Sequence, residues 1–194
     1  MTAKATRSPG RPRNEAADAA IPDAAARLMT ERGYRGMTVA AVAAVAGVSE
    51  PTVYLRYPTK LDLALAAIAR LPAFTQPFDT GDARSDLTHL LDQMTRSAQD
   101  VGLSLVGVVL VEEADHPELL RRWRATAGRA LSDAIGQIIE RGQDRQQVSA
   151  DVDADVLADL FVGAYLGRYL NRGRPDRAWT TDVIAMLWDH LAAR

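Results

Sequence analysis

The chain of 194 residues contains no cysteine, so disulfides and thiolate metal sites are excluded. This absence agrees with a reducing compartment. Long apolar runs are missing as well. The longest, 101–111, is interrupted by two glycines and a serine and has about half the length that spans a bilayer. No basic segment followed by an apolar one opens the sequence. We therefore expect a soluble, cytoplasmic protein.

Signals of catalysis are equally sparse. The three histidines are far apart, and there is no phosphate-binding glycine loop, nucleophile elbow or paired-carboxylate motif. His116 follows Glu112, Glu113 and Asp115, which are possible metal ligands. An Asp-His-Pro sequence is also typical of a loop that begins a helix, with the glutamates facing water. We predict a protein that is not an enzyme and that uses no metal or other cofactor.

The most informative stretch is 38–60, TVAAVAAVAGVSEPTVYLRYPTK, which predicts two short helices joined by a tight turn. Thr38 is a favourable N-cap for the first helix, and Gly47 ends it because glycine adopts the left-handed conformation without a Cβ penalty. Ser49 caps the second helix, and Pro51 is tolerated in its first turn. This spacing predicts a helix-turn-helix whose second helix is free to enter a major groove, with an ordinary helical corner as the alternative.

Within the second predicted helix, Val53 and Tyr57 lie four residues apart and are expected to face inward. The other faces carry Thr52, Tyr54, Leu55 and Arg56. Pro58 ends this helix, and Thr59 caps a third one. A compact helical head, built around the turn, follows from this pattern.

Residues 24–71, which include ARLMTERGYRGMTVAAVAAVAGVSEPTVYLRYPTKLDL, resemble the DNA-binding domain of the TetR/AcrR family of bacterial transcriptional regulators. The resemblance implies a homodimer, an all-helical ligand-binding domain and release from DNA when a small molecule binds. It also implies a four-helix dimer interface made by the last two helices of each subunit. It carries a phosphate-binding role onto Lys60 and a backbone-contact role onto Tyr54. Two positions depart from the common pattern: Glu50 stands where a lysine or arginine is frequent, and Leu55 where a polar residue is frequent.

These residues lead to a predicted DNA interface. Leu55 can touch a thymine methyl, Glu50 can accept from a cytosine amine, and Thr52 also faces bases. Phosphate contacts, which fix register, are expected from Tyr54, Arg56 and Lys60. The full predicted set is Arg11, Arg13, Thr38, Ser49, Glu50, Thr52, Tyr54, Leu55, Arg56, Tyr57 and Lys60.

Charge is distributed unevenly along the chain. Residues 1–60 contain nine Lys or Arg and five Asp or Glu, whereas residues 61–194 contain fourteen and twenty. A basic N-terminal part on an acidic remainder is typical of a DNA reader with a second domain, and a chance asymmetry is the alternative. Four basic residues lie in 1–13, which holds no acid and includes a Gly-Arg-Pro-Arg segment. Such arginines can enter an A·T-rich minor groove, unless the segment is a solubilising tail.

The predicted fold class is all-α, with no strand pattern and no repeat. We expect a flexible basic arm at 1–14, a helix-turn-helix domain at 15–72 and a helical ligand-binding and dimerisation domain at 82–194. The boundary lies at 71–81, where two prolines and a glycine interrupt the periodicity. The C-terminal domain is expected to have five helices, at 83–100, 103–113, 117–141, 153–170 and 178–193. We expect the second to be buried and Gly142 to end the third.

The C-terminal domain is predicted to bind a small, mainly apolar effector. Candidate wall residues are Met94, Trp123, Phe161 and Tyr165, all of which also suit an ordinary helical core. Apolar stripes on the last two helices suit a dimer interface, although both helices could instead pack within the domain. The favoured function is a ligand-responsive regulator, more specifically a repressor of a palindromic operator. The alternative is a helix-turn-helix protein-interaction module without a functional ligand pocket.

Overall fold

The computed structural model describes residues 15–70, 79–97 and 103–193, and every regular element of this part is helical. The only pairing between extended residues in these ranges is an isolated antiparallel bridge between Val148 and Ala192. The all-α prediction is therefore confirmed. The elements are α1 Glu15–Gly36, α2 Val39–Ala46, α3 Glu50–Arg56, α4 Lys60–Ala69, α5 Ala83–Ser97, α6 Leu103–Val111, α7 Pro117–Trp123, the π-helical η2 Arg124–Gly128, α8 Arg129–Asp144, α9 Ala154–Arg172 and α10 Arg177–Leu191.

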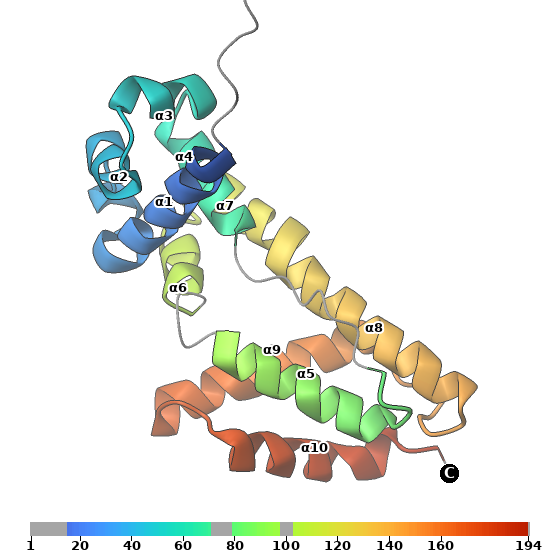
Figure 1. Cartoon of the computed structure of the whole chain (residues 1–194). Helices are drawn as coiled ribbons and strands as arrows, with labels where there is room; N and C mark the ends of the chain where they lie inside the picture. The colour runs from blue at the N-terminus through green and yellow to red at the C-terminus, as the bar shows by residue number, and fades with distance from the viewer. Residues whose placement is uncertain (1–14, 71–78, 98–102, 194) are drawn as a thin grey trace, which may run out of the picture.

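Helices α1 to α4 form a head at one end of the molecule, and α5, α8, α9 and α10 form a body at the other (Figure 1). Within the head, α1 packs against both α2 and α4, while α3 packs against α2. The α1 segment bends at Gly33, where φ is 70° and ψ is 172°. This bend lets Tyr34 and Met37 turn back into the head, where both are buried.

The turn between α2 and α3 has the predicted form. The Thr38 hydroxyl accepts from the backbone N–H of Ala41, and Gly47 adopts the left-handed conformation, with φ at 68°. Ser49 occupies the cap position before α3, but its hydroxyl pairs with the Thr52 hydroxyl at 2.8 Å instead of accepting from a backbone N–H. The predicted side-chain cap at Ser49 is therefore absent.

The start of α4 is fixed by a reciprocal capping box. The Thr59 hydroxyl accepts from the backbone N–H of Asp62, and the Asp62 carboxylate accepts from the backbone N–H of Thr59, each at 3.0 Å. This arrangement satisfies two helix-end donors at once. It fixes the first turn of α4, which begins at Lys60.

Two apolar cores lie along the molecule. One joins the head to α6 and α7, with Leu105, Val109, Leu119 and Leu120 packed among residues of α1 and α4. The other is formed by α5, α8, α9 and α10 around the fully buried Phe161. The expectation that α6 is buried was wrong, because only one face of it packs: Val111 is 81% exposed.

The predicted long helix at 117–141 exists as a continuous run of α7, η2 and α8, which extends from the head to the far end of the body (Figure 1). The widened π-helical turn in its middle was not predicted. Gly142 does not end the run, as expected, but lies buried inside α8. A Cβ there would lie 2.6 Å from Val148 Cγ2, so this glycine allows the following loop to pack closely.

Within the described ranges, no helix combines the length and the apolar character needed to cross a bilayer. The body helices α5 and α10 pack against each other, and α8 packs against α5 and α9. Their residues bury one face and leave the other exposed, as expected of amphipathic helices in a small bundle.

Candidate nucleic-acid interface and ligand cavity

Helix α3 presents one face to solvent. Val53 is fully buried beneath it, whereas Leu55 is 83% exposed and Tyr54 is 49% exposed. Glu50 is exposed at the start of the same helix. The structure therefore brings Glu50, Tyr54 and Leu55 to the surface of one short helix, as a recognition helix requires.

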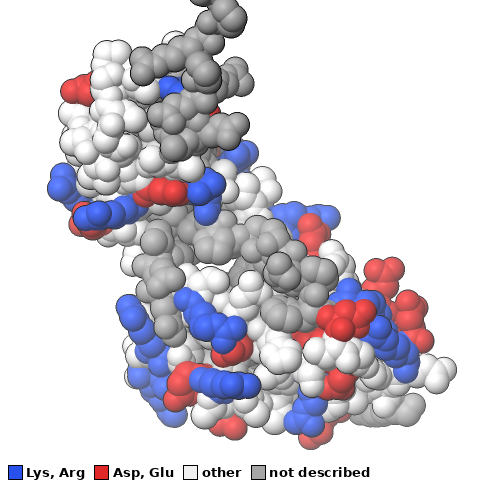
Figure 2. All heavy atoms as spheres, in the orientation of Figure 1, with Lys and Arg blue, Asp and Glu red and all other residues white. Residues whose placement is uncertain are grey.

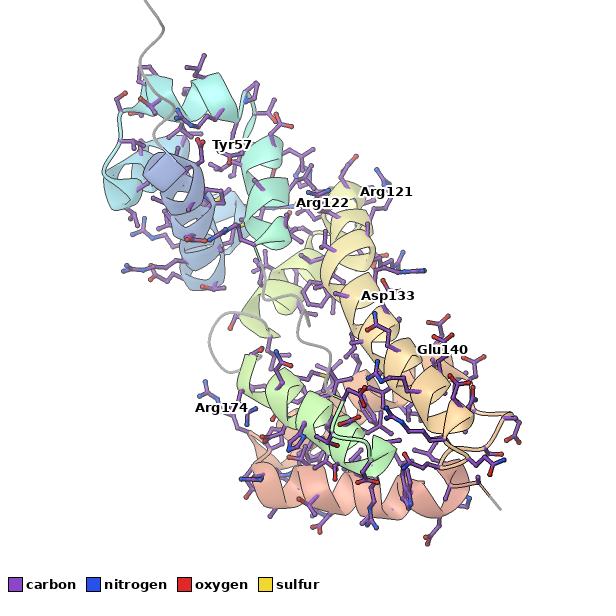
Figure 3. All side chains as sticks on the ribbon, turned by 45° about the vertical axis from the view of Figure 1, so that its right-hand side comes forward. Tyr57, Arg121, Arg122, Asp133, Glu140 and Arg174 are labelled. Atoms are coloured by element: carbon purple, nitrogen blue, oxygen red, sulfur yellow. The ribbon has the colours of Figure 1, made fainter. Side chains whose placement is uncertain are left out.

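The predicted hydroxyl and aromatic contacts have different surroundings. Thr38 is exposed, while Thr52 is half-buried and bonds to Ser49. Tyr57 is half-buried against the core of the head, where Figure 3 shows it directed inward between α1 and α4. Burial is the main cause that raises the pKa of Tyr57. Tyr57 supports the head, as its inward position in the sequence pattern predicts.

The two predicted phosphate-binding cations of the head are engaged with protein groups. Arg56 Nε lies 2.5 Å from Asp18 Oδ1 of α1, and the Arg56 side chain is 22% exposed. Lys60 Nζ donates to the Arg35 carbonyl oxygen at 3.0 Å and lies 4.7 Å from the centre of the Tyr34 ring. Burial is the main cause that lowers the pKa of Lys60. Lys60 keeps further N–H donors beyond the bond to Arg35.

The folded head has no net positive charge. Residues 15–70 contain six Lys or Arg and six Asp or Glu. Three of the arginines pair with acids inside the head, in the pairs Arg27–Glu31, Arg56–Asp18 and Arg70–Asp23. Figure 2 shows the visible surface over α2 and α3 as mostly uncharged. The basic excess of the N-terminal region thus comes from 1–13; Arg11 and Arg13 lie outside the described residues.

A junction between the head and the α6–α7 connection was missed by sequence reasoning. Arg35 pairs with Asp115 and lies 3.5 Å from Glu112. Glu112 is only 7% exposed, so the expectation that it faces water was wrong. The His116 ring lies edge-on to Tyr34, with 4.6 Å between ring centres, and makes no cap hydrogen bond. The only sequence signal for this junction is the group of acidic residues just before His116.

These acidic residues form no metal site in the structure. Among the described residues, no group of three or more His, Asp or Glu side chains is placed to hold a metal ion. The described part of the chain instead uses Glu112 and Asp115 as partners of Arg35. Near this junction, α7 packs against α4, and Figure 3 shows Arg122 on the side of α7 that faces α4 and Arg121 on the opposite side.

A cavity of about 600 Å³ lies between the α7–α8 run, α5, α6 and α9. Three of the four candidate wall residues, Met94, Trp123 and Tyr165, line it. Phe161 does not, because it is fully buried in the core of the body. The π-helical turn contributes Arg124, Ala127 and Gly128 to the wall. Trp123 also packs against the head core, so one side chain touches both regions.

Helices α9 and α10 expose a second apolar region. A groove of about 520 Å³ between them includes Leu160, Trp179, Met186 and Leu187. The exposed large apolar residues of these two helices are Val156, Leu160, Val162, Tyr169, Leu170 and Met186. A Cβ at Gly163 or Gly167 would meet no atom of the described residues within 4 Å.

An exposed helix-turn-helix, joined to a helical body with a cavity beside it, is typical of helix-turn-helix regulators. The family described as bacterial regulatory proteins, tetR family, matches residues 21–67, and the tetracyclin repressor-like C-terminal domain matches residues 77–187. The chain belongs to the TetR family. Both matched families are families of regulators, which confirms the prediction of a regulator rather than an enzyme.

Individual proteins similar to this chain are also transcriptional regulators. An uncharacterized HTH-type transcriptional regulator of Mycobacterium tuberculosis is 38% identical over 130 residues, which make up 64% of this chain and 61% of that protein. The chain therefore spans about three fifths of that relative's length. A DNA-binding transcriptional repressor TetR of Mycobacteroides abscessus is 32% identical over 148 residues, 70% of this chain and 77% of that protein.

A solved structure shares the fold. A TetR-family transcriptional regulator from Mesorhizobium loti superimposes with a TM-score of 0.75, covering 94% of this chain and 100% of its own. The sequence identity is 17%, so the likeness concerns the fold.

Proposed function

We propose that the chain is a ligand-responsive transcriptional repressor that binds a palindromic operator as a homodimer and leaves it when a small molecule occupies the cavity. The α3 face carries the proposal. Leu55 and Tyr54 are exposed there, on a helix anchored by the buried Val53. A large apolar side chain that points away from its own core suits contact with thymine methyl groups in a major groove.

Affinity for phosphate and recognition of bases come from two parts of the chain. The α3 face supplies base contacts through Leu55, Glu50 and Thr52, and contains no guanidinium for a bidentate contact with guanine. Because residues 15–70 are electrically balanced, most of the electrostatic attraction to phosphate comes from 1–13, with Arg11 and Arg13 in or near the minor groove. Lys60 and Tyr54 add phosphate contacts at the edge of α3.

Dimerisation uses the exposed apolar faces of α9 and α10. These faces hold large side chains such as Leu170, 79% exposed, and Met186, 73% exposed. A patch of this kind on a soluble bundle marks an interaction surface, and pairing with a second copy covers it symmetrically. Two heads held at one distance then read two half-sites.

Ligand control passes along the α7–η2–α8 run. The middle of this run, which includes the π-helical turn, lines the cavity, and its first helix, α7, packs against α4. A ligand that prefers one packing of Trp123 shifts α7 relative to α4 and changes the spacing of the two heads. Release from DNA follows where the new spacing no longer matches the operator.

The test compares Leu55→Ala with Val111→Ala, which truncates an equally exposed residue on α6 (83% and 81%). An operator selected from random duplex DNA is titrated by fluorescence anisotropy across a salt series. Leu55→Ala should weaken operator binding about tenfold and leave binding to unrelated DNA unchanged, because only a base contact is lost. Val111→Ala should bind like the parent. Equal operator binding by both variants would show that Leu55 does not contact the operator.

A protein-interaction module remains a second candidate function, favoured by the balanced charge of the folded head and by the acidic Glu50. Salt dependence separates the two. A DNA reader loses affinity steeply between about 50 and 200 mM salt, and Arg11→Ala with Arg13→Ala lowers the slope of log K against log salt. Lys60→Ala should lower the same slope and weaken all DNA sequences alike. Salt-independent binding would favour the interaction module.

A further inference from the structure

The end of α1, the start of α4 and the α6–α7 connection meet around the ring of Tyr34. The ammonium of Lys60, the first residue of α4, lies over this ring at 4.7 Å from its centre. The His116 ring lies edge-on to the same ring, with 4.6 Å between ring centres. Lys60 Nζ also donates to the carbonyl oxygen of Arg35 at 3.0 Å. The Lys60 cation is therefore held at the point where the head meets the α6–α7 connection.

Glu112 places a buried negative charge at the same point. This residue is 7% exposed, and its Oε2 has no hydrogen-bond partner among the described residues. Its other oxygen, Oε1, lies 3.5 Å from Arg35 Nε, which is longer than an ordinary hydrogen bond between N–H and oxygen. A buried carboxylate that is only partly paired attracts any cation within its reach, because its own hydration has been lost.

Two cations are in a position to serve this carboxylate. The Arg35 side chain pairs with it and also with Asp115, and is itself 76% exposed. Lys60 is the second: burial is the main cause that lowers its pKa, and the charge of Glu112 opposes that shift. An ammonium on a flexible four-carbon stem turns easily, so its direction depends on the charges around it. Lys60 therefore lies between the attraction of Glu112 and that of a DNA phosphate.

We propose that Arg35 is a positioning residue for DNA binding: its guanidinium neutralises Glu112 and thereby leaves the Lys60 ammonium available to a backbone phosphate. This inference rests on the proposed function, which uses Lys60 as a phosphate contact. Without Arg35, the buried carboxylate takes the neighbouring ammonium as its partner, and each head loses one phosphate contact. Arg35 acts through Lys60 and needs no contact of its own with DNA.

The first test measures DNA binding by fluorescence anisotropy across a salt series, with circular dichroism to verify that each variant is folded. Arg35→Ala should weaken binding to the operator and to unrelated duplex DNA alike, by about three- to tenfold. It should also lower the slope of log K against log salt by about one for each head. Adding Glu112→Gln should restore the slope of the parent. Arg27→Ala, the matched control, removes an exposed guanidinium of α1 that pairs with Glu31 instead, and should bind like the parent.

A second background separates positioning from a general structural defect. In a Lys60→Ala chain, Arg35→Ala should have no further effect on DNA binding or on the salt slope, because the residue through which it acts is gone. A direct contact of Arg35 with phosphate, or a distorted head, would still weaken binding in that background. Either a further loss there, or a slope that Glu112→Gln does not restore, would overturn the proposal.

A measurement without DNA distinguishes failure of this proposal from failure of the proposed function. The chain contains two lysines, Lys4 and Lys60, so labelling by acetic anhydride, followed by mass spectrometry, reports each one separately. Only the unprotonated amine reacts. Arg35→Ala should lower the labelling of Lys60 relative to Lys4 at least about twofold, because Glu112 then holds the ammonium in its charged form, and adding Glu112→Gln should reverse this.

Unchanged labelling of Lys60 would overturn the proposal whether or not the chain binds DNA. If the labelling changes as expected but the parent binds no DNA, the proposed function is wrong and the competition between Arg35 and Lys60 for Glu112 stands. If the parent binds DNA and Lys60→Ala weakens it, but Arg35→Ala does not, the DNA-binding role stands and the positioning role of Arg35 is wrong.

Discussion

Gly142 gives the sharpest prediction on packing, because it lies in the interior of α8, where alanine would normally be preferred. Replacing glycine with alanine inside a helix usually stabilises a protein by about 0.5–1 kcal/mol. At Gly142, however, the new Cβ would lie 2.6 Å from Val148 Cγ2 and 3.0 Å from Ala83 Cβ. Neither contact involves the far end of a flexible side chain, so the backbone must move.

Overpacking of this kind costs about 1–3 kcal/mol. After the helix-propensity gain is subtracted, Gly142→Ala should lower the free energy of unfolding by about 1–2 kcal/mol. Gly136→Ala is the matched control in the same helix, since its Cβ would meet only Ala154 Cβ at 4.0 Å. This control should raise the free energy of unfolding by about 0.5–1 kcal/mol.

Urea denaturation followed by circular dichroism, at one protein concentration, measures both variants. The Tm of Gly142→Ala should fall and the Tm of Gly136→Ala should rise. A change of about 1 kcal/mol corresponds to a Tm shift of about 2–4 °C in a chain of this size. A Gly142→Ala variant at least as stable as the parent would show that the 142–148 turn is free to relax. Close packing of the turn would then not require a glycine at position 142.

Three further predictions concern the body, the junction and the dimer. Asp82 precedes α5, and its carboxylate accepts from the backbone N–H of Ser85 at 2.9 Å. Asp82→Ala should cost about 1 kcal/mol at pH 7, the usual effect of losing a helix N-cap. The hydrogen bond that the Ser85 hydroxyl donates to Asp82 is the main cause that lowers the pKa of Asp82. Its contribution is therefore complete above the unfolded pKa, and urea melts should show the gap closing as the pH falls from about 4 through the lowered pKa. Arg35→Ala should lower the free energy of unfolding by about 1–2 kcal/mol, because Glu112 stays buried without its cation. In a double-mutant cycle, adding Glu112→Gln should recover most of this loss. Additive effects of the two substitutions would refute the pairing of Arg35 with Glu112. Leu170→Glu should shift the sedimentation coefficient from that of a dimer to that of a monomer, whereas Val111→Glu should not. Identical sedimentation profiles for the two variants would show that α9 is not part of the dimer interface.

Much of the head could be predicted because its signals are local. Gly47 needs a left-handed conformation, Thr38 and Thr59 are caps, and Val53 faces inward from a short helix. Each of these follows from residues within a turn or two of chain. The exposed position of Leu55 follows from the same helical spacing.

The junction and the details of the cavity could not be predicted in this way. Arg35 meets Asp115 across 80 positions of sequence, and an ion pair of that separation has no local pattern. In the sequence, Gly142 is typical of a residue that ends a helix. Its role becomes clear only from the fold, in which Val148 packs directly against it. Phe161 and Tyr165 look alike in the sequence as inward aromatics, yet only Tyr165 reaches the cavity. The π-helical turn likewise depends on packing rather than composition.

The central claim is that two copies of this chain read one operator. The most direct measurement is selection from random duplex DNA by the purified chain at about 150 mM salt with excess competitor, where non-specific binding is weak. We expect enrichment of a single inverted repeat, with half-sites spaced for two heads of one dimer. A folded, dimeric protein that enriches no sequence would contradict it.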